Sequence, residues 1–367
     1  MIAADRPQSG AKLLVLDARG GLHYARAADL PTVLRAGDLV VANDAATLPA
    51  SLHGIHLPTG EAIEARLAGQ PSGDDETRFI AVVFGAGNFR TRTEHRAPPP
   101  PLHADDRLSL GPLAATVEGT LDHPRLITLK FDGLASTLWA GLARHGRAIQ
   151  YAHVPEPLKL WDVWTKVAGV PAAFEPPSAG FALTWSMLAA FPRKGIGFAT
   201  LTHAAGISST GDAELDERLP FDEKYFIPQS TAAAIRKAKA EGGRVIAIGT
   251  SVVRALEYAS RNGVLRAGTG VARGRVGAAT PLKLVDAIVS GVHAAGESHY
   301  ELLRAFASDE TLRYTAELME RRGFRNHEFG DFVLIEREGA KAARGAFAGG
   351  GVSMRYLHRG QQEGLRS

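Results

Sequence analysis

Residues 243–260 read GRVIAIGTSVVRALEYAS, and this stretch decides the fold class of the chain. The apolar run 245–248 has the length of a buried strand, and residues 251–260 have the spacing of a helix. The junction, Gly249-Thr250-Ser251, places backbone N–H groups and two hydroxyls where an anion can bind. Plain helix capping explains the same tripeptide. The missing Walker lysine excludes a nucleoside-triphosphate loop.

Two charged residues follow on the predicted helix. Arg254 and Glu257 are three positions apart and therefore share a face, so we expect them to form a surface ion pair.

Strands and helices alternate on both sides of this unit. GIGFATLTH at 195–203 and VDAIVSGV at 285–292 have the pattern of strands, and 231–241 and 298–307 have that of helices. Two earlier strands are expected in KLLVLD and DLVVA, near the N-terminus. This alternation predicts an α/β domain with a mostly parallel sheet covered by helices.

Residues 55–147 have a different character. Short strand-like pieces, AIEARL, RFIAVVF, LAATVEGT and RLITLKF, are separated by Gly, Asp and Pro. They predict a small antiparallel β-barrel inserted in the larger domain. The expected organisation is therefore an α/β catalytic domain formed by 1–54 and 148–355, a barrel at 55–147 and a tail at 356–367.

The composition is that of a globular protein. Of 367 residues, 45% are hydrophobic and 22% are charged, and the length predicts about two domains. The absence of cysteine excludes thiol nucleophiles, disulfides and cysteine metal sites. No signal peptide and no membrane-length apolar run is found, so we expect a cytoplasmic protein with no membrane partner. The net charge of +3 permits RNA binding without requiring it.

Polar residues follow several predicted strands and are candidates for chemistry. Asn43 and Asp44 end one strand, and His203 and His293 end two others. Carboxylates and imidazoles at the ends of strands suit proton transfer near neutral pH. A turn at Asn43-Asp44 and locally hydrogen-bonded histidines are the structural alternatives. Neither an HxH nor an HExxH pattern occurs, so no metal is expected.

Two further segments are candidates for a pocket wall. PPSAG at 176–180 contains Ser178 and Gly180 and leads into a helical pattern that starts at Thr184. Asp331 precedes the apolar run FVLI and either forms a turn or faces a ligand.

These segments, in this order, resemble the S-adenosylmethionine:tRNA ribosyltransferase-isomerases of queuosine biosynthesis. Residues 249–257 are similar to the family motif Gly-Thr-Thr-Ser-Val-Arg-Thr-Leu-Glu. Weaker similarities follow in the same order along almost the whole chain, at 38–50, 178–184, 200–203, 223–228, 286–293 and 329–331.

The resemblance implies an α/β domain interrupted by a small barrel. It also implies transfer and isomerisation of the ribosyl group of S-adenosylmethionine onto 7-aminomethyl-7-deazaguanine in tRNA, which yields epoxyqueuosine, adenine and methionine. S-adenosylmethionine would be a substrate, and tRNA the expected partner.

The resemblance also implies a set of site residues. We expect His293 to handle a proton, and Thr250 and Arg254 to hold the methionine carboxylate or ribose hydroxyls, with Glu257 as an alternative partner that orients Arg254. The further catalytic candidates are His203, Asp44 and Asp331, and the further substrate-binding candidates are Asn43, Ser178, Gly180, Thr184 and Gly249.

The chain departs from the family motifs at several polar positions. The family's Thr-Arg after Asn-Asp is Ala45-Ala46, and an alanine cannot make the bidentate anion contact of an arginine. Other polar motif residues are replaced at Ala182, Phe221, Gly291 and Gly296. These losses leave the acceptor open. A paralogue with a small-molecule acceptor, a lyase and a non-catalytic binding protein are the alternatives, and the oligomeric state is not fixed.

Overall fold

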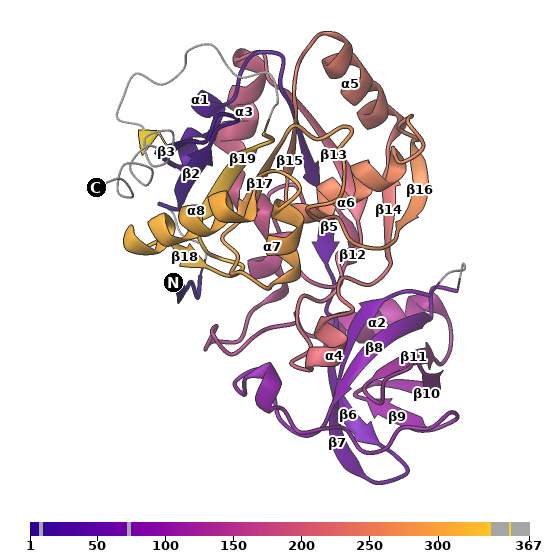
Figure 1. Cartoon of the computed structure of the whole chain (residues 1–367). Helices are drawn as coiled ribbons and strands as arrows, with labels where there is room; N and C mark the ends of the chain where they lie inside the picture. The colour runs from indigo at the N-terminus through magenta and orange to yellow at the C-terminus, as the bar shows by residue number, and fades with distance from the viewer. Residues whose placement is uncertain (7–9, 72–74, 339–351, 354–367) are drawn as a thin grey trace.

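The computed structural model describes residues 1–6, 10–71, 75–338 and 352–353. A larger body of sheet and helices lies above a smaller β-barrel, and the chain passes from the first into the second and back again (Figure 1). The predicted tail at 356–367 lies outside the described residues. Within the described part, no helix has the length and apolar character needed to cross a membrane.

A ten-stranded sheet forms the centre of the larger body. Its strand order is β16 (Gly268–Ala272), β14 (Glu223–Ile227), β13 (Gly197–His203), β4 (Leu39–Asn43), β15 (Val245–Ile248), β17 (Ala287–Gly291), β19 (Phe332–Glu336), β2 (Lys12–Leu16), β3 (Gly21–Arg26) and β20 (Val352–Ser353). The run β13-β4-β15-β17 and the pair β19-β2 are parallel. The remaining pairs are antiparallel. The α/β class is confirmed, but the sheet is mixed where mostly parallel strands were predicted, because apolar patterns do not encode strand direction.

Helices cover both faces of this sheet. On one face lie α5 (Gln229–Ala240), α6 (Thr250–Ala259), α7 (Ser298–Leu303) and α8 (Asp309–Arg321), and on the other lie α1 (Leu30–Val33) and α3 (Trp185–Arg193). Strand β15 shows why both faces need cover. Val245 and Ala247 enter the first core, whereas Ile246 and Ile248 enter the second. Each fully buried aliphatic side chain contributes about 1.5–3 kcal/mol.

The predicted antiparallel barrel is confirmed. It closes in the order β10 (Leu113–Thr120), β11 (Leu126–Phe131), β8 (Arg78–Phe84), β7 (Glu61–Gly69), β6 (Ser51–His56) and β9 (Arg107–Leu110), and it has a core of its own. Helix α2 (Ala135–His145) packs beside β10. Strands β6 and β9 were not among the predicted segments, and β6 begins upstream of residue 55, where the sequence places the start of the insertion. Closure leaves the barrel without a free sheet edge.

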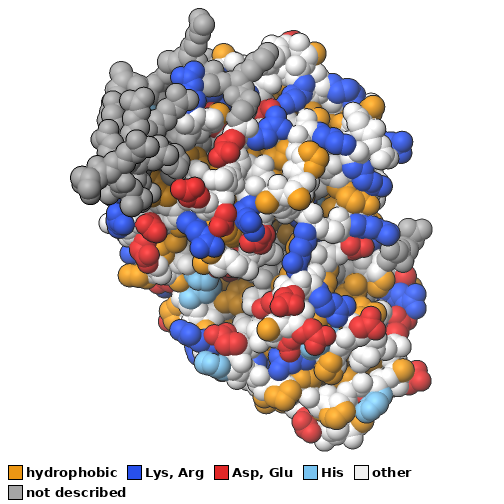
Figure 2. Space-filling view, in the orientation of Figure 1, with side chains coloured by type: hydrophobic (Ala, Val, Ile, Leu, Met, Phe, Trp, Pro, Cys, Tyr) orange, Lys and Arg blue, Asp and Glu red, His pale blue; other side chains and the backbone are white. Residues whose placement is uncertain are grey.

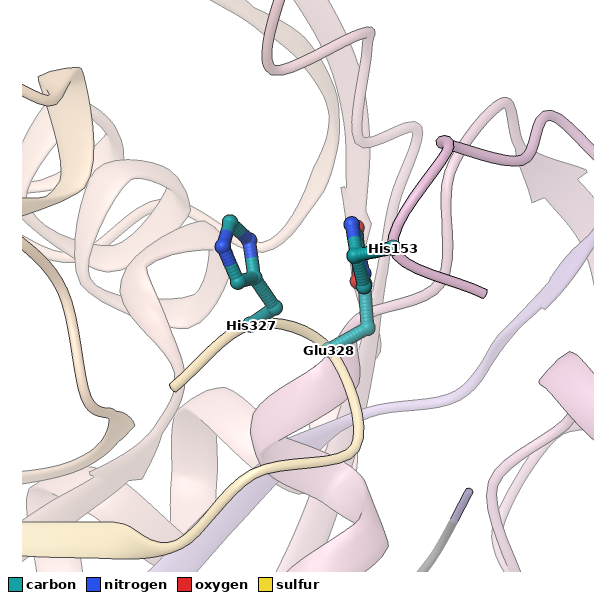
Figure 3. Close-up of side chains that lie close together, drawn as sticks. All are labelled: His153, His327 and Glu328. Atoms are coloured by element: carbon teal, nitrogen blue, oxygen red, sulfur yellow. The ribbon is translucent and has the colours of Figure 1, made fainter. Parts of the chain in front are cut away.

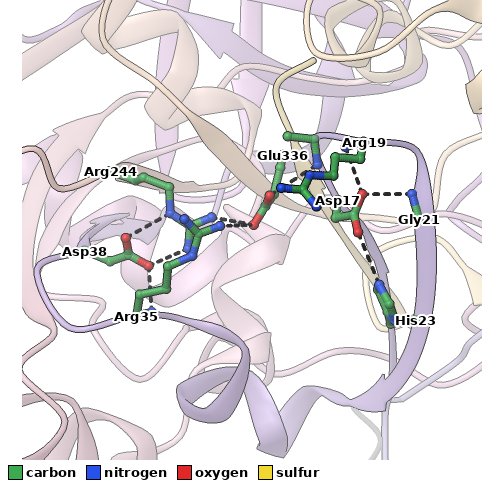
Figure 4. Close-up of polar contacts among 9 residues, drawn as sticks. Asp17, Arg19, Gly21, His23, Arg35, Asp38, Arg244 and Glu336 are labelled. Atoms are coloured by element: carbon green, nitrogen blue, oxygen red, sulfur yellow. Dashed lines mark hydrogen bonds and ion pairs between the residues drawn. The ribbon is translucent and has the colours of Figure 1, made fainter. Parts of the chain in front are cut away.

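A network of buried charges joins the amino ends of the parallel strands (Figure 4). Asp38 precedes β4, Arg244 precedes β15, and Glu336 ends the antiparallel β19 at the same edge. Arg244 Nε lies 2.9 Å from Asp38 Oδ1 and Nη2 lies 2.6 Å from Oδ2, and Nη1 donates to Glu336. Arg35 adds a second cation, 3.2 Å from Glu336 Oε1. Burial opposes ionisation, but both carboxylates raise the pKa of Arg244 above its usual value.

Candidate active site

The opposite edge of the sheet, where β13, β4, β15 and β17 end, borders two adjoining cavities. This is the edge at which parallel α/β sheets bind ligands. The large cavity has a volume of about 640 Å³ and reaches from Ser178 and His293 to the barrel loop at Thr93. The small cavity has a volume of about 80 Å³ and lies against the start of α6. Both are lined by Glu175, Pro176, Ser208, Ser298 and His299.

The surface around this region is uneven in charge. On the face shown in Figure 2, Lys and Arg side chains gather over the part of the large body that holds α5 and β16. Asp and Glu side chains are concentrated lower, between the large body and the barrel.

The predicted anion-binding junction faces the small cavity. Gly249 precedes α6 with a φ of +93°, a left-handed conformation that favours glycine. Thr250 and Ser251 line the cavity. Ser251 Oγ accepts a hydrogen bond of 3.2 Å from Asn43 Nδ2. The side chain of Asn43 also bonds the backbone N–H and carbonyl of His203, so it joins the ends of β4 and β13.

The predicted surface pair of Arg254 with Glu257 is not formed. Both side chains are buried, and Arg254 instead forms an ion pair with Glu223. Glu257 accepts hydrogen bonds from the backbone N–H groups of residues 283–285, at 2.7–3.0 Å. The prediction was wrong because α6 packs with the face that holds Arg254 and Glu257 toward the protein interior. Burial lowers the pKa of Arg254 to about 10, which leaves it charged at neutral pH.

His203 lies behind the small cavity rather than in it. Its ring is fully buried, and neither ring nitrogen has a hydrogen-bond partner among the described residues. Nε2 lies 3.4 Å from Glu223 Oε2. Burial, and then the charge of Arg254, hold the pKa of His203 well below its usual value, so the ring is neutral.

The two predicted carboxylates, Asp44 and Asp331, line neither cavity. Asp44 Oδ1 accepts a hydrogen bond of 2.6 Å from Thr202 Oγ1. The oxygens of Asp331 accept from the backbone N–H groups of Lys12 and Arg325, at 2.6 and 2.8 Å. These contacts join neighbouring segments of the chain, which is a structural use of each carboxylate.

His293, in contrast, lies in the large cavity. Its Nδ1 is 3.2 Å from Glu297 Oε2, and its ring stacks on that of His299 with centroids 4.6 Å apart. Burial, and then the nearby charge of His293, lower the pKa of His299 to about 3. His299 is therefore a neutral ring that supports His293.

The remaining predicted binding residues divide between cavity and scaffold. Ser178 lines the large cavity at the start of the short helix Ser178–Ala182. A Cβ on Gly180 would lie 2.7 Å from Thr165 Cγ2, so glycine is needed there for packing. Thr184 is exposed and caps α3, because its Oγ1 accepts from the N–H of Met187 at 3.3 Å.

Sequence reasoning missed Glu175, a carboxyl of the cavity walls whose pKa is strongly shifted. Glu175 accepts hydrogen bonds from the Tyr151 hydroxyl and, at 3.1 Å, from the N–H of Ser208. Burial raises its pKa to about 7. The segment 150–177 lacks strand or helix periodicity, and only the adjacent prolines marked it as a wall.

A second missed group is the set His153, His327 and Glu328 (Figure 3). Their ligand atoms lie within 4.8 Å of one another, and His153 Nε2 is 2.7 Å from Glu328 Oε2. The two rings are stacked, with centroids 4.2 Å apart and planes 23° from parallel. The lone pairs of stacked rings do not converge on one point, so metal binding would require His327 to rotate. As it stands, the set is a hydrogen-bonded pair beside a stacked ring.

Comparison with known proteins gives the family. The family model described as queuosine biosynthesis protein matches residues 2–335. The chain belongs to this family. The resemblance seen in the sequence is thereby confirmed.

Individual relatives match over most of their length. Proteins of Acidiphilium cryptum and Sorangium cellulosum, both named S-adenosylmethionine:tRNA ribosyltransferase-isomerase, are each 31% identical to this chain. The matches cover 92% and 91% of this chain and 96% and 95% of the relatives. A crystal structure of S-adenosylmethionine tRNA ribosyltransferase from Thermotoga maritima covers 91% of the chain and 96% of its own, with 21% identity and a TM-score of 0.48.

Proposed function

We propose that this protein is an S-adenosylmethionine-dependent ribosyltransferase-isomerase. It transfers and isomerises the ribosyl group of S-adenosylmethionine onto 7-aminomethyl-7-deazaguanine in tRNA and releases adenine and methionine. Family membership and the shared name of the relatives support this activity. The observation that supports this activity at the site is the pair of adjoining cavities at the carboxyl ends of the strands. Together these cavities are lined by a helix N-terminus and by acidic and basic side chains. A tRNA acceptor would place the protein in the cytoplasm.

The donor would occupy the larger cavity and extend into the small one at the start of α6. A volume of about 640 Å³ is within the usual range of small-molecule sites. At the start of α6, Thr250 and the free N–H groups would bind the methionine carboxylate or a ribose hydroxyl. Arg254 adds positive charge behind this end, although Glu223 already binds its guanidinium.

We assign His293 as the base that removes a proton from the ribose. The sulfonium acidifies the neighbouring ribose carbon, so an imidazole held beside that carbon can remove a proton there. Glu297 binds Nδ1 and leaves Nε2 for the substrate. The stacked His299 keeps the ring in place. No step is assigned to Asp44, His203 or Asp331.

A second candidate acceptor is a small amine that binds as its cation and loses a proton before it attacks. The large cavity is lined by four carboxylates, by Glu175, whose carboxyl favours its neutral form, and by one arginine, Arg92, so the excess negative charge repels phosphate groups; the four carboxylates are Glu94, Asp216, Glu297 and Glu328. The same lining suits the aminomethyl group of the tRNA base, provided that the phosphates stay outside.

One experiment tests the function and separates the acceptors. The protein is incubated with S-adenosylmethionine, with tRNA bearing the deazaguanine base, with the same tRNA lacking it, and without RNA, and adenine is measured. We expect adenine only with the modified tRNA. Adenine without RNA would support a small acceptor or a lyase. Binding of S-adenosylmethionine in calorimetry without any adenine would indicate a binding protein.

A further inference from the structure

We propose that Glu175 is the acid that delivers a proton to the departing adenine, with Tyr151 as the group that positions it. The inference rests on the proposed function and adds a residue that neither the sequence motifs nor the family resemblance indicates.

The backbone holds Glu175 in the wall between the two cavities. It follows β12 (Val170–Ala173), and the N–H of Phe174 bonds the carbonyl of Ala205 at 2.8 Å. Pro176 comes next and also lines both cavities. Glu175 is therefore part of the wall on both sides, next to the small cavity with Thr250 and the large cavity with His293.

The surroundings of this carboxyl favour its neutral form. Its exposed fraction is 7%, and among the described residues no Lys, Arg or His forms an ion pair with it. Arg66 of the barrel acts on it electrostatically, but that guanidinium is hydrogen-bonded to Glu64 at 2.8 Å. Glu328 adds a second negative charge. A buried carboxyl without a paired cation holds its proton at pH values where an ordinary glutamate is ionised.

The hydrogen bonds around Tyr151 suit both protonation states. The hydroxyl contacts Glu175 Oε1, the carbonyl of Ser209 at 3.2 Å and Ser208 Oγ at 3.4 Å. When Glu175 is ionised, the tyrosine donates to it. When Glu175 is protonated, its O–H can donate to the tyrosine oxygen, and the tyrosine hydroxyl can turn to the carbonyl of Ser209. Burial raises the pKa of Tyr151 well above its usual value, so the hydroxyl keeps its own proton.

The departure of adenine requires one bond to break and one proton to be transferred. The bond between the sugar carbon and the adenine nitrogen breaks, and its electron pair stays on the adenine. The proton of the Glu175 carboxyl goes to a ring nitrogen of adenine, which leaves as the neutral base. The ring oxygen donates a lone pair to the sugar carbon, and the Glu175 carboxylate regains a proton from solvent.

The test compares wild type with Glu175→Gln, which keeps the shape and one hydrogen-bond acceptor but has no acidic proton. We expect S-adenosylmethionine to bind within about threefold of wild type in calorimetry, and adenine release to fall by about 100-fold or more. The wild-type rate should decline as the pH rises through about 7, because the acid form is lost, and the residual rate of the variant should not. Glu175→Asp should restore part of the rate and the pH dependence.

Two controls keep the outcomes distinct. Glu94→Gln changes an exposed carboxyl on the rim of the same cavity and should leave the midpoint of the pH profile unchanged. A wild-type protein that releases no adenine with any acceptor would overturn both the function and this assignment. Adenine release by wild type, with a Glu175→Gln rate and pH profile equal to it, would overturn the assignment of Glu175 alone.

Discussion

The two ends of the ten-stranded sheet differ in how their buried charges are partnered. At the amino ends of the parallel strands, Arg244 binds both Asp38 and Glu336, and Arg35 also reaches Glu336 (Figure 4). At the carboxyl ends, Glu175 has no paired cation among the described residues, and burial raises its pKa to about 7.

This difference indicates which end is built for stability. Buried ions whose partners are all present have nothing left to offer a ligand, whereas a carboxyl that is costly to ionise can exchange a proton with one. The imidazole of His203, which has no hydrogen bond to any described residue although Glu223 lies 3.4 Å away, is a second unmatched group at the carboxyl end. We therefore assign the amino end to the fold and the carboxyl end to the chemistry, and substitutions at each end test that assignment.

The largest expected effect is at the amino end. Arg244→Met should lower the free energy of unfolding by about 3–5 kcal/mol, because Asp38 loses the guanidinium of Arg244 and Glu336 loses one of the two guanidinium groups that bind it among the described residues. Urea denaturation measures this. S-adenosylmethionine should bind the folded variant as it binds wild type. A loss below about 1 kcal/mol would show that the network contributes little to stability.

At the other end, removing a charge should stabilise the protein. The folded-state pKa of Glu175 is raised from 4.5 to about 7, so the folded protein binds more protons than the unfolded chain between these values. The free energy of unfolding therefore contains a stabilising contribution below pH 4.5 that is lost as the pH rises through 7. Glu175→Gln should be more stable than wild type at pH 8, by up to about 3 kcal/mol.

The same comparison of Glu175→Gln with wild type at pH 5 is the control, because most of the difference in stability should disappear there.

Glu64 is a buried carboxyl whose pKa is shifted in the opposite direction. Burial alone would raise its pKa, but the charges of Arg66 and Arg96 lower it to about 2, so its contribution is present above pH 4.5 and is lost toward pH 2. Equal stability of Glu175→Gln and wild type at both pH 5 and pH 8 would mean that Glu175 is not forced into its neutral form.

A smaller effect is expected at the start of α6. Thr250→Val keeps the shape of the side chain and removes the hydroxyl that faces the small cavity. The affinity for S-adenosylmethionine should fall about tenfold, which corresponds to about 1.4 kcal/mol, while the unfolding free energy stays within about 0.5 kcal/mol. Calorimetry on the folded variant and on the wild-type protein measures this difference in affinity. Unchanged affinity would remove Thr250 from the donor site.

The smallest effect concerns a residue that the family resemblance places in the site and the structure places at a helix cap. Thr184→Ala should cost about 1 kcal/mol of stability, since the N–H of Met187 loses its acceptor. It should leave the affinity for S-adenosylmethionine unchanged. A drop in affinity at constant stability would show that Thr184 contributes to binding S-adenosylmethionine.

Much of the fold could be predicted because its elements have regular patterns. The apolar run 245–248 and the helical spacing after it give β15 and α6, and four short alternating segments reveal the barrel. Strand β6, SLHGIH, was missed because its glycine and histidines interrupt the apolar alternation. The sequence analysis predicted more parallel strand pairs than the sheet contains, because strand direction depends on the crossover connections, which local patterns do not show.

Several residues of the site could be predicted because they follow regular elements. Thr250 and His293 follow strands of the sheet, and both line the cavities. Asp331 satisfies the same criterion but binds backbone amides, which sequence position cannot distinguish from facing a ligand. Glu175 and Tyr151 come from an irregular segment, and their contact with residues 208–209 exists only in the folded chain.

The most direct test of this account is the protonation state of Glu175, followed by infrared difference spectroscopy between wild type and Glu175→Gln across pH. The account predicts the carbonyl band of a protonated carboxyl that persists through pH 6, disappears with a midpoint near pH 7 and changes when S-adenosylmethionine is added. A band that is already lost by pH 5 would show an ordinary ionised glutamate and would contradict the distinction between the two ends of the sheet.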